Sequence, residues 1–65
     1  MSADRPSSRL TVDQRRAIFR ALVEAQDAGA GVDASRAAVA DQFGVGVEQV
    51  RVVEREGEEK DWPPL

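Results

Sequence analysis

The stretch VADQFGVGVEQVRVVEREG, residues 39–57, constrains the fold of this chain more than any other segment. Apolar residues recur in it at helical spacing on both sides of the triplet Gly44, Val45 and Gly46. Two short helices joined by about three residues need a residue that accepts positive φ, a small residue at the crossing and apolar side chains facing a third helix. The stretch supplies all three, so it predicts a pair of helices joined by a tight turn.

Specific positions are expected to lock this pair together. Gly44 ends the first helix, Ala40 lies four residues earlier at the crossing, and Val45 fills the turn. The side chains expected to point into the core are Val39, Phe43, Val50 and Val53. This spacing is typical of DNA-binding helix-turn-helix proteins. We therefore expect an all-α fold, a three-helix bundle that contains a helix-turn-helix.

The first of the three helices is predicted upstream of this pair. Thr11 and Gln14 have the spacing of a capping box, which favours a helix start at this point. The sequence AGAG, residues 28–31, is expected to end the helix, because glycine accepts the left-handed conformation. The apolar stripe of this helix consists of Ile18, Phe19, Leu22 and Ala25.

The other boundaries follow from further capping residues. Asp33 is expected to cap the second helix, Gly46 to cap the third, and Gly57 to close the third. The predicted organisation is a flexible basic arm over residues 1–10, a three-helix domain over residues 11–57, and an acidic tail over residues 58–65 that contains Trp62 and packs on the domain.

Composition limits the classes of protein to consider. A chain of 65 residues buries only about 60% of the surface that its unfolded form exposes. It has no cysteine and no histidine, so a disulfide framework, a zinc finger and a thiolate site are excluded, and we expect no metal. No apolar run approaches the roughly 18 residues that span a bilayer, and the start MSADRPSSRL has no signal-peptide pattern. We expect a cytoplasmic protein without membrane contact.

Catalytic and cofactor sites are not indicated. Without histidine, cysteine or tyrosine, general acid-base and nucleophilic chemistry would rest on carboxylates, arginines, one lysine or serines that have no evident base. The acidic cluster lacks the ligand order of a calcium loop, and AGAG lacks the strand and lysine of a phosphate-binding loop. The sequence predicts neither an enzyme nor a bound cofactor.

The net charge of −3 is distributed unevenly. The chain up to Arg20 is rich in arginine, whereas the remainder is dominated by acids. Attraction to phosphate needs positive potential at the contacting face, so a uniformly polyanion-binding surface is excluded while a local basic face remains open.

The segment FGVGVEQVRVVE is similar to the promoter-reading helix-turn-helix near the C-terminus of the major bacterial sigma factors. The resemblance covers residues 35–56 and is carried by the Phe-Gly-Val turn together with Glu48, Val50, Arg51 and Glu54. It implies that residues 47–56 lie in the major groove of promoter DNA. That family usually has a hydroxyl residue at position 46 and basic or amide residues at positions 47, 49 and 52. The resemblance therefore carries over DNA contacts for Glu48 and Arg51, with Gln49 as a conservative addition.

Helical geometry indicates the outward face independently. If Val50 and Val53 face the core, the opposite side presents Glu48, Arg51, Val52 and Arg55. The arginines suit guanine edges or phosphates, the glutamate suits cytosine, and the valine suits a thymine methyl. The alternative is a solvated charged surface in which Arg51 pairs with Glu54, and Arg55 pairs with Glu56, Glu58 and Glu59.

Acids close to the third helix oppose DNA binding, because carboxylates near phosphates lower affinity. They are Glu54, Glu56, Glu58, Glu59 and Asp61. They make either a solubility face or a docking surface for a basic partner, such as a polymerase subunit. Two functions follow: a small DNA-binding or transcription-associated protein that binds double-stranded DNA, or a protein-protein interaction module that uses the third helix or the acidic end, for instance within a transcription complex.

Both ends of the chain carry further candidates. At the N-terminal end, Arg5 and Arg9 lie in the arm, and Arg16 and Arg20 follow in the first helix. This arrangement suits a DNA-binding protein whose arm enters the minor groove; the alternative is that the arm is a solubilising tail.

At the C-terminal end, folding Trp62 over the helices would stabilise the domain by about 2 kcal/mol through burial of apolar surface. The alternative is that DWPPL is a polyproline anchor for another protein.

Overall fold

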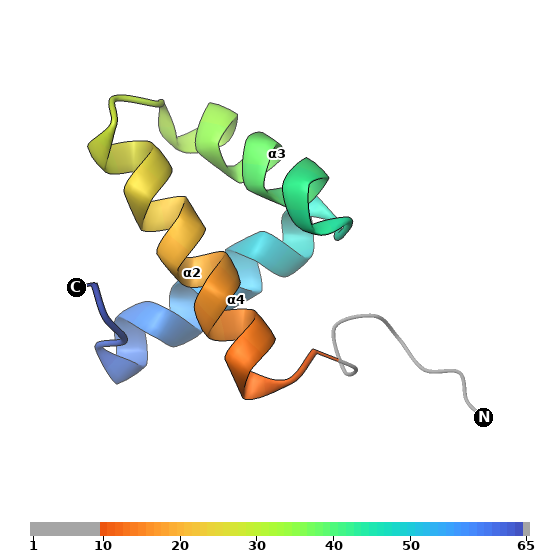
Figure 1. Ribbon diagram of the computed structural model, residues 1–65, viewed down its shortest axis with the longest axis vertical. Helices are drawn as coiled ribbons and strands as arrows, with labels where there is room; N and C mark the ends of the chain where they lie inside the picture. The colour runs from red at the N-terminus through yellow and green to blue at the C-terminus, as the bar shows by residue number, and fades with distance from the viewer. Residues whose placement is uncertain (1–9, 65) are drawn as a thin grey trace.

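The structure, a computed structural model, describes residues 10–64, and within that range the chain forms three helices and no strand. The helices are α2 (Val12–Asp27), α3 (Val32–Phe43) and α4 (Val47–Lys60). Each packs against the other two, and α4 passes behind α2 in the view of Figure 1. The prediction of an all-α fold with three helices is confirmed for these residues. None of the three is long and apolar enough to cross a membrane.

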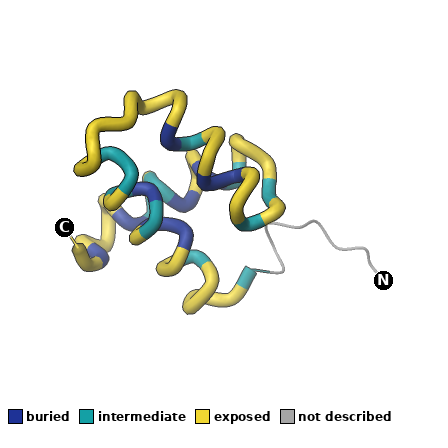
Figure 2. Tube along the Cα trace, turned by 45° about the horizontal axis from the view of Figure 1, so that its top comes forward, coloured by how far each residue is buried: buried dark blue, intermediate teal, exposed yellow. Residues whose placement is uncertain are grey.

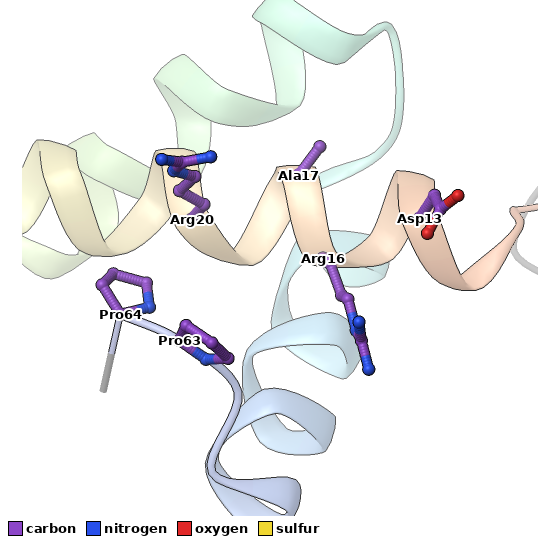
Figure 3. Close-up of a pocket in the computed structure, with 6 residues that line it drawn as sticks. All are labelled: Asp13, Arg16, Ala17, Arg20, Pro63 and Pro64. Carbon is purple, nitrogen blue, oxygen red and sulfur yellow. The ribbon is translucent and has the colours of Figure 1, made fainter.

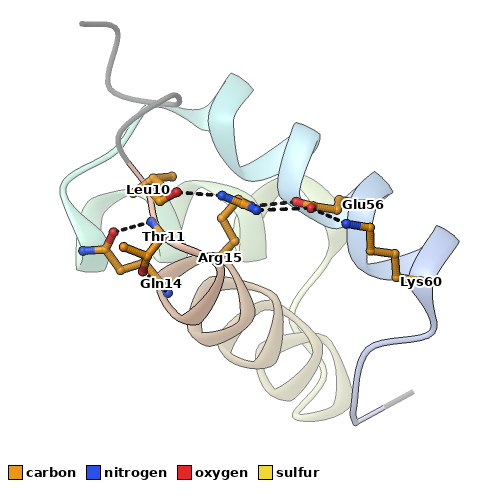
Figure 4. Close-up of polar contacts among 6 residues, drawn as sticks. All are labelled: Leu10, Thr11, Gln14, Arg15, Glu56 and Lys60. Carbon is orange, nitrogen blue, oxygen red and sulfur yellow. Dashed lines mark hydrogen bonds and ion pairs between the residues drawn. The ribbon is translucent and has the colours of Figure 1, made fainter.

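The start of α2 is fixed by the predicted capping box (Figure 4). The backbone N–H of Gln14 donates to Thr11 Oγ1 at 3.0 Å, and the backbone N–H of Thr11 donates to Gln14 Oε1 at 2.8 Å. The helix ends at Asp27, and Gly29 follows with φ of 105°. The prediction that AGAG ends this helix is therefore confirmed.

The start of α3 lies two residues before the predicted position. The helix begins at Val32 with Gly31 as its N-cap, so the prediction that Asp33 caps it is wrong. The backbone N–H of Ser35 donates to the carbonyl of Gly31 at 2.8 Å, which starts the helical hydrogen-bond ladder before Asp33. Asp33 instead lies in the first turn, where its negative charge is favourable near the helix N-terminus.

The turn between α3 and α4 matches the predicted glycine positions. Gly44 takes the left-handed conformation with φ of 70°, and the N–H of Val45 donates to the carbonyl of Ala40 at 3.0 Å. Gly46 is the N-cap of α4, and its N–H donates to Gln49 Oε1 at 2.8 Å. The predictions that Gly44 ends α3 and that Gly46 caps α4 are both confirmed.

The end of α4 differs from the prediction. Gly57 does not close the helix, which continues to Lys60, and Asp61 is the C-cap with φ of 53°. Gly57 is buried beneath the ring of Phe19, where a side chain would collide with the ring. The glycine therefore serves the close approach of α2 and α4, and the helix ends only where the N–H of Trp62 donates to the carbonyl of Gly57 at 2.9 Å.

The core lies where the three helices meet, and every helix contributes buried residues to it (Figure 2). Val39, Ala40, Val50 and Val53 are buried as predicted, whereas Phe43 and Val45 are only partly buried and pack against the edge of the core. The segment after α4 also contributes. Trp62 is only 5% exposed and meets Phe19 edge to face, with ring centroids 6.1 Å apart and an interplanar angle of 77°. The complete core is Ile18, Phe19, Leu22, Val39, Ala40, Val50, Val53 and Trp62.

Candidate nucleic-acid interface

The outer face of α4 presents the four side chains that helical geometry places opposite the core. Val50 and Val53 are fully buried under the helix, and Val52 is 62% exposed on its other side. A shallow hollow on this face is lined by Glu48, Arg51, Val52 and Arg55. The structure therefore brings these four residues together on the solvent side, and we call them the α4 face.

The two acids nearest the α4 face are engaged with arginines of the neighbouring helices. Glu54 Oε1 accepts from Arg36 on α3, with Nη2 at 2.8 Å and Nε at 2.9 Å. Glu56 Oε1 accepts from Nε of Arg15 on α2 at 2.9 Å. Their side chains are only 15% and 21% exposed, so α4 is held by an ion pair on each flank.

These pairs show that Glu54 and Glu56 of α4 bind arginines of the other helices rather than those of α4. Arg51 does not pair with Glu54 and Arg55 does not pair with Glu56, because each glutamate is turned towards another helix. Within residues 10–64, Arg51 and Arg55 form no ion pair at all. The predicted pairs Arg51–Glu54 and Arg55–Glu56 are therefore absent from the described residues, where Arg51 and Arg55 are both solvent-exposed.

The contacts of Glu56 alter the pKa of its carboxyl group. Partial burial raises its pKa, but hydrogen bonds and charges from Lys60 and Arg15 outweigh burial, so the pKa of Glu56 lies below its ordinary value. Figure 4 shows the chain of contacts from the Leu10 carbonyl through Arg15 and Glu56 to Lys60. Glu56 thus remains negative at neutral pH, with its charge compensated by two cations.

The remaining acids lie toward the C-terminal end of α4. Glu58, Glu59 and Asp61 are exposed, and Glu58 borders a second hollow that also includes Arg36, Arg51 and Arg55. The α4 face itself therefore carries two arginines against Glu48, and the acidic surface begins one turn beyond Arg55.

Gln49 has a local structural contact that its sequence position did not reveal in advance. Its side-chain oxygen accepts the N–H of Gly46 and so caps the start of α4. Gln49 is half-buried and does not line the hollow of the α4 face. Only its amide N–H groups remain as donors to a base.

The other basic candidates do not join the α4 face. Arg16 and Arg20 line a separate groove beside Pro63 and Pro64, shown in Figure 3. The guanidinium of Arg16 lies 5.6 Å from the centroid of Trp62. Arg20 Nε lies 3.4 Å from Glu24 on its own helix. Arg5 and Arg9, the arm candidates, lie outside the described residues.

Two arginines that hold α4 were not singled out as structural residues from the sequence. Arg36 precedes Val39 and Ala40 by three and four residues, so it lies on the inward side of α3. Arg15 precedes Ile18 and Phe19 in the same way on α2. This spacing of three and four residues from core positions could have identified both arginines, because such a side chain lies beside the core and can reach the neighbouring helix.

Comparison of this chain with family profiles, characterised protein sequences and solved structures found no significant match.

Proposed function

We propose that α3, the turn and α4 form a helix-turn-helix and that the protein binds double-stranded DNA with α4 in the major groove, as a small transcription-associated protein. The observation that carries the proposal is the state of the α4 face. Arg51 and Arg55 are exposed without an ion pair within residues 10–64, while Glu54 and Glu56 are bound to other helices. Two positive donors therefore project from the outer side of α4, and two of the glutamates on this helix are already paired with other helices.

The chemistry of the α4 face suits the edges of base pairs. Each guanidinium presents a planar fork of donors that matches guanine O6 and N7 or a phosphate. Glu48 can accept from the amino group of cytosine, and Val52 offers an apolar contact to the methyl of thymine. With 14 residues, α4 is about 21 Å long, which is enough to follow the major groove over several base pairs.

The ion pairs that hold α4 favour a role in sequence-specific contacts with DNA. Ion pairs on its two flanks, from Arg15 to Glu56 and from Arg36 to Glu54, fix its rotation against α2 and α3. Side chains on a helix held in this way are presented in a fixed geometry, which a specific contact requires. The similarity of FGVGVEQVRVVE to sigma-factor promoter-reading helices supports the same placement.

Titration of the full chain with random-sequence duplex DNA tests the proposal. At low salt, backbone amide resonances of residues 48–55 should shift, and affinity should fall as salt rises by roughly one power per phosphate contact. Replacing Arg51 or Arg55 by glutamine should each weaken binding, and should lower the salt slope by about one where that arginine contacts phosphate.

The matched control is Arg20→Gln, which removes one positive charge from α2, away from the α4 face. It should weaken DNA binding less than Arg51→Gln or Arg55→Gln does. The absence of any DNA response at low salt, or an equal loss in this control, would count against the placement of α4 in the groove.

A protein-interaction module is the second candidate, and exposed valines on α4 favour it. Val47 is 44% and Val52 is 62% exposed, which is apolar surface that a protein partner would cover. The exposed acids beyond Arg55 suit a basic partner such as a component of a transcription complex. A lysine-rich peptide titrated into the chain should shift Glu58, Glu59 and Asp61 if this function is the right one. A shift of the α4 face by DNA, with no response to the peptide, would contradict it.

A further inference from the structure

We propose that the groove between α2 and the C-terminal segment binds an acidic peptide segment of another protein. Figure 3 shows Pro63 and Pro64 opposite α2, and the groove has a volume of about 500 Å³. It is lined by Asp13, Arg16, Ala17, Arg20, Pro63 and Pro64. No lining residue is shared with the α4 face, so this inference does not depend on the proposed DNA binding.

The anchor for a carboxylate is the pair of arginines on α2. Arg16 and Arg20 are one helical turn apart and both line the groove, with their guanidinium groups pointing in different directions in Figure 3. Arg16 rests over the Trp62 ring, a cation–π contact that limits the orientations of its guanidinium. The guanidinium of Arg16 forms no ion pair within residues 10–64. A glutamate or aspartate side chain can therefore be held by a guanidinium that is already oriented.

Arg20 can join this anchor at little cost. Its contact with Glu24 is 3.4 Å long, and the two side chains are 73% and 65% exposed. An exposed pair of this kind contributes little, because water screens it and two long side chains must be ordered to form it. A ligand carboxylate can replace Glu24 as the partner of Arg20.

The opposite wall suits apolar parts of a peptide. Pro63 and Pro64 have no backbone N–H, and their rings restrict φ, so the wall needs little ordering when a ligand binds. The neighbouring Trp62 is buried against Phe19, which attaches this wall to the core. Ala17 also lines the groove. An aliphatic or proline residue next to the acidic residue would fill this part of the groove.

Asp13 indicates a peptide rather than a nucleic-acid strand. Its carboxylate lies in the same groove as the two arginines, where it would repel a run of phosphates. A peptide carries backbone N–H donors beside its acidic side chain, and a carboxylate accepts such donors. The groove therefore matches a ligand that combines a carboxylate, an N–H donor and an apolar side chain, which is the chemistry of an acidic peptide.

Selection from a random heptapeptide display library against the immobilised full chain tests this inference. Peptides retained by the wild type and lost with Arg16→Gln/Arg20→Gln should contain aspartate or glutamate next to an aliphatic or proline residue. A selected peptide, added to the labelled chain, should shift the side-chain N–H signals of Arg16 and Arg20 and the indole N–H of Trp62. Removing one charged contact should weaken its affinity about five- to tenfold in Arg20→Gln.

The single variant Arg20→Gln separates a loss of binding from a loss of folding. Arg20 is exposed, and replacing it leaves the contact between Arg16 and Trp62 intact. Arg51→Gln is the matched control, since it removes the same charge from the α4 face and should leave peptide affinity unchanged. Failure to enrich peptides over the double variant, or enrichment of peptides without acids, would overturn the inference.

Other occupants of the groove give distinct results. Shifts of the groove residues with duplex DNA but with no selected peptide would assign the groove to nucleic acid. Shifts that depend only on protein concentration would assign it to a second copy of the chain. Either outcome overturns the acidic-peptide inference. A negative DNA titration combined with peptide binding in the groove would overturn only the proposed DNA binding.

Discussion

Gly57 on α4 lies directly against the ring of Phe19 on α2, so closely that a Cβ on residue 57 would overlap the ring carbons. Trp62 meets the same ring from another side, edge to face. Phe19 is therefore enclosed between the helix and the segment that follows it, and the glycine sets how closely α2 and α4 approach. A glycine inside a helix costs about 1 kcal/mol relative to alanine, which this close packing offsets.

Gly57→Ala should destabilise the protein even though alanine is the better helix former. Overpacking of a tight contact costs about 1–3 kcal/mol, which exceeds or cancels the gain in helix propensity. For a domain of this size each kcal/mol lowers Tm by about 4–8 °C, so thermal unfolding followed by circular dichroism is sensitive enough. In the double variant Phe19→Leu/Gly57→Ala the total loss should be smaller than the sum of the single losses. Strictly additive losses would show that the two side chains do not collide.

Trp62→Ala should remove most of the stability of the domain. Truncation of a buried aromatic residue costs about 3–5 kcal/mol, and a 65-residue domain has roughly 3–10 kcal/mol in total. Trp62→Phe should cost less, because it keeps an aromatic contact with Phe19. Urea unfolding followed by far-ultraviolet circular dichroism measures both variants without relying on tryptophan fluorescence. An unchanged midpoint for Trp62→Ala would show that the C-terminal segment contributes nothing to the core.

The pair Arg36 and Glu54 should couple more strongly than an exposed pair on one helix. Its side chains are 24% and 15% exposed, and it joins α3 to α4. A double-mutant cycle with Arg36→Gln and Glu54→Gln should give a coupling of about 1 kcal/mol. The same cycle on Arg20 and Glu24, which are 73% and 65% exposed, should give less than about 0.5 kcal/mol. Equal coupling in the two cycles would contradict the assigned role of Arg36 in fixing α4.

The fold was largely predictable because its signals are local. The capping box at Thr11 and Gln14 and the left-handed glycine at Gly44 depend only on residues a few positions away, and both appear as expected. The Asp33 cap is a local error of two residues, whereas the other error in a helix boundary arises because a distant residue decides the outcome. The sequence pattern around Gly57 predicts a helix end, because it does not show that the Phe19 ring lies against this glycine.

The candidate site was predictable in one respect only. Helical phase identifies the outward side chains of α4 from the positions of Val50 and Val53. The same helical spacing does not show which arginine forms an ion pair with a given glutamate. Glu54 lies three residues from Arg51 along the chain, yet it pairs with Arg36 from another helix, because its side chain points into the α3–α4 contact. Partners of this kind depend on the packing of helices, which single-sequence patterns leave open.

The lowered pKa of Glu56 should make part of the stability depend on pH. A carboxyl whose pKa is lower in the folded than in the unfolded state stabilises the fold at pH above its unfolded value, near 4.5, and this contribution is lost as pH falls through the lowered pKa. The difference in unfolding free energy between wild type and Glu56→Gln should therefore be largest at neutral pH and shrink below about pH 4.5. Urea unfolding from neutral pH to about pH 3 measures it. A difference that stays constant over this range would contradict the assigned contacts with Arg15 and Lys60.

The turn between α3 and α4 should depend on Gly44 for conformational reasons alone. Its φ of 70° is in the left-handed region, and a Cβ built at this position meets nothing within 4 Å. Gly44→Ala should therefore cost about 1–2 kcal/mol through backbone strain rather than through a clash. Gly44→Asn should cost less, because asparagine visits this conformation more readily than alanine does. Chemical unfolding of the two variants separates the causes: equal losses, or a larger loss for asparagine, would indicate that space and not backbone conformation demands glycine in this turn.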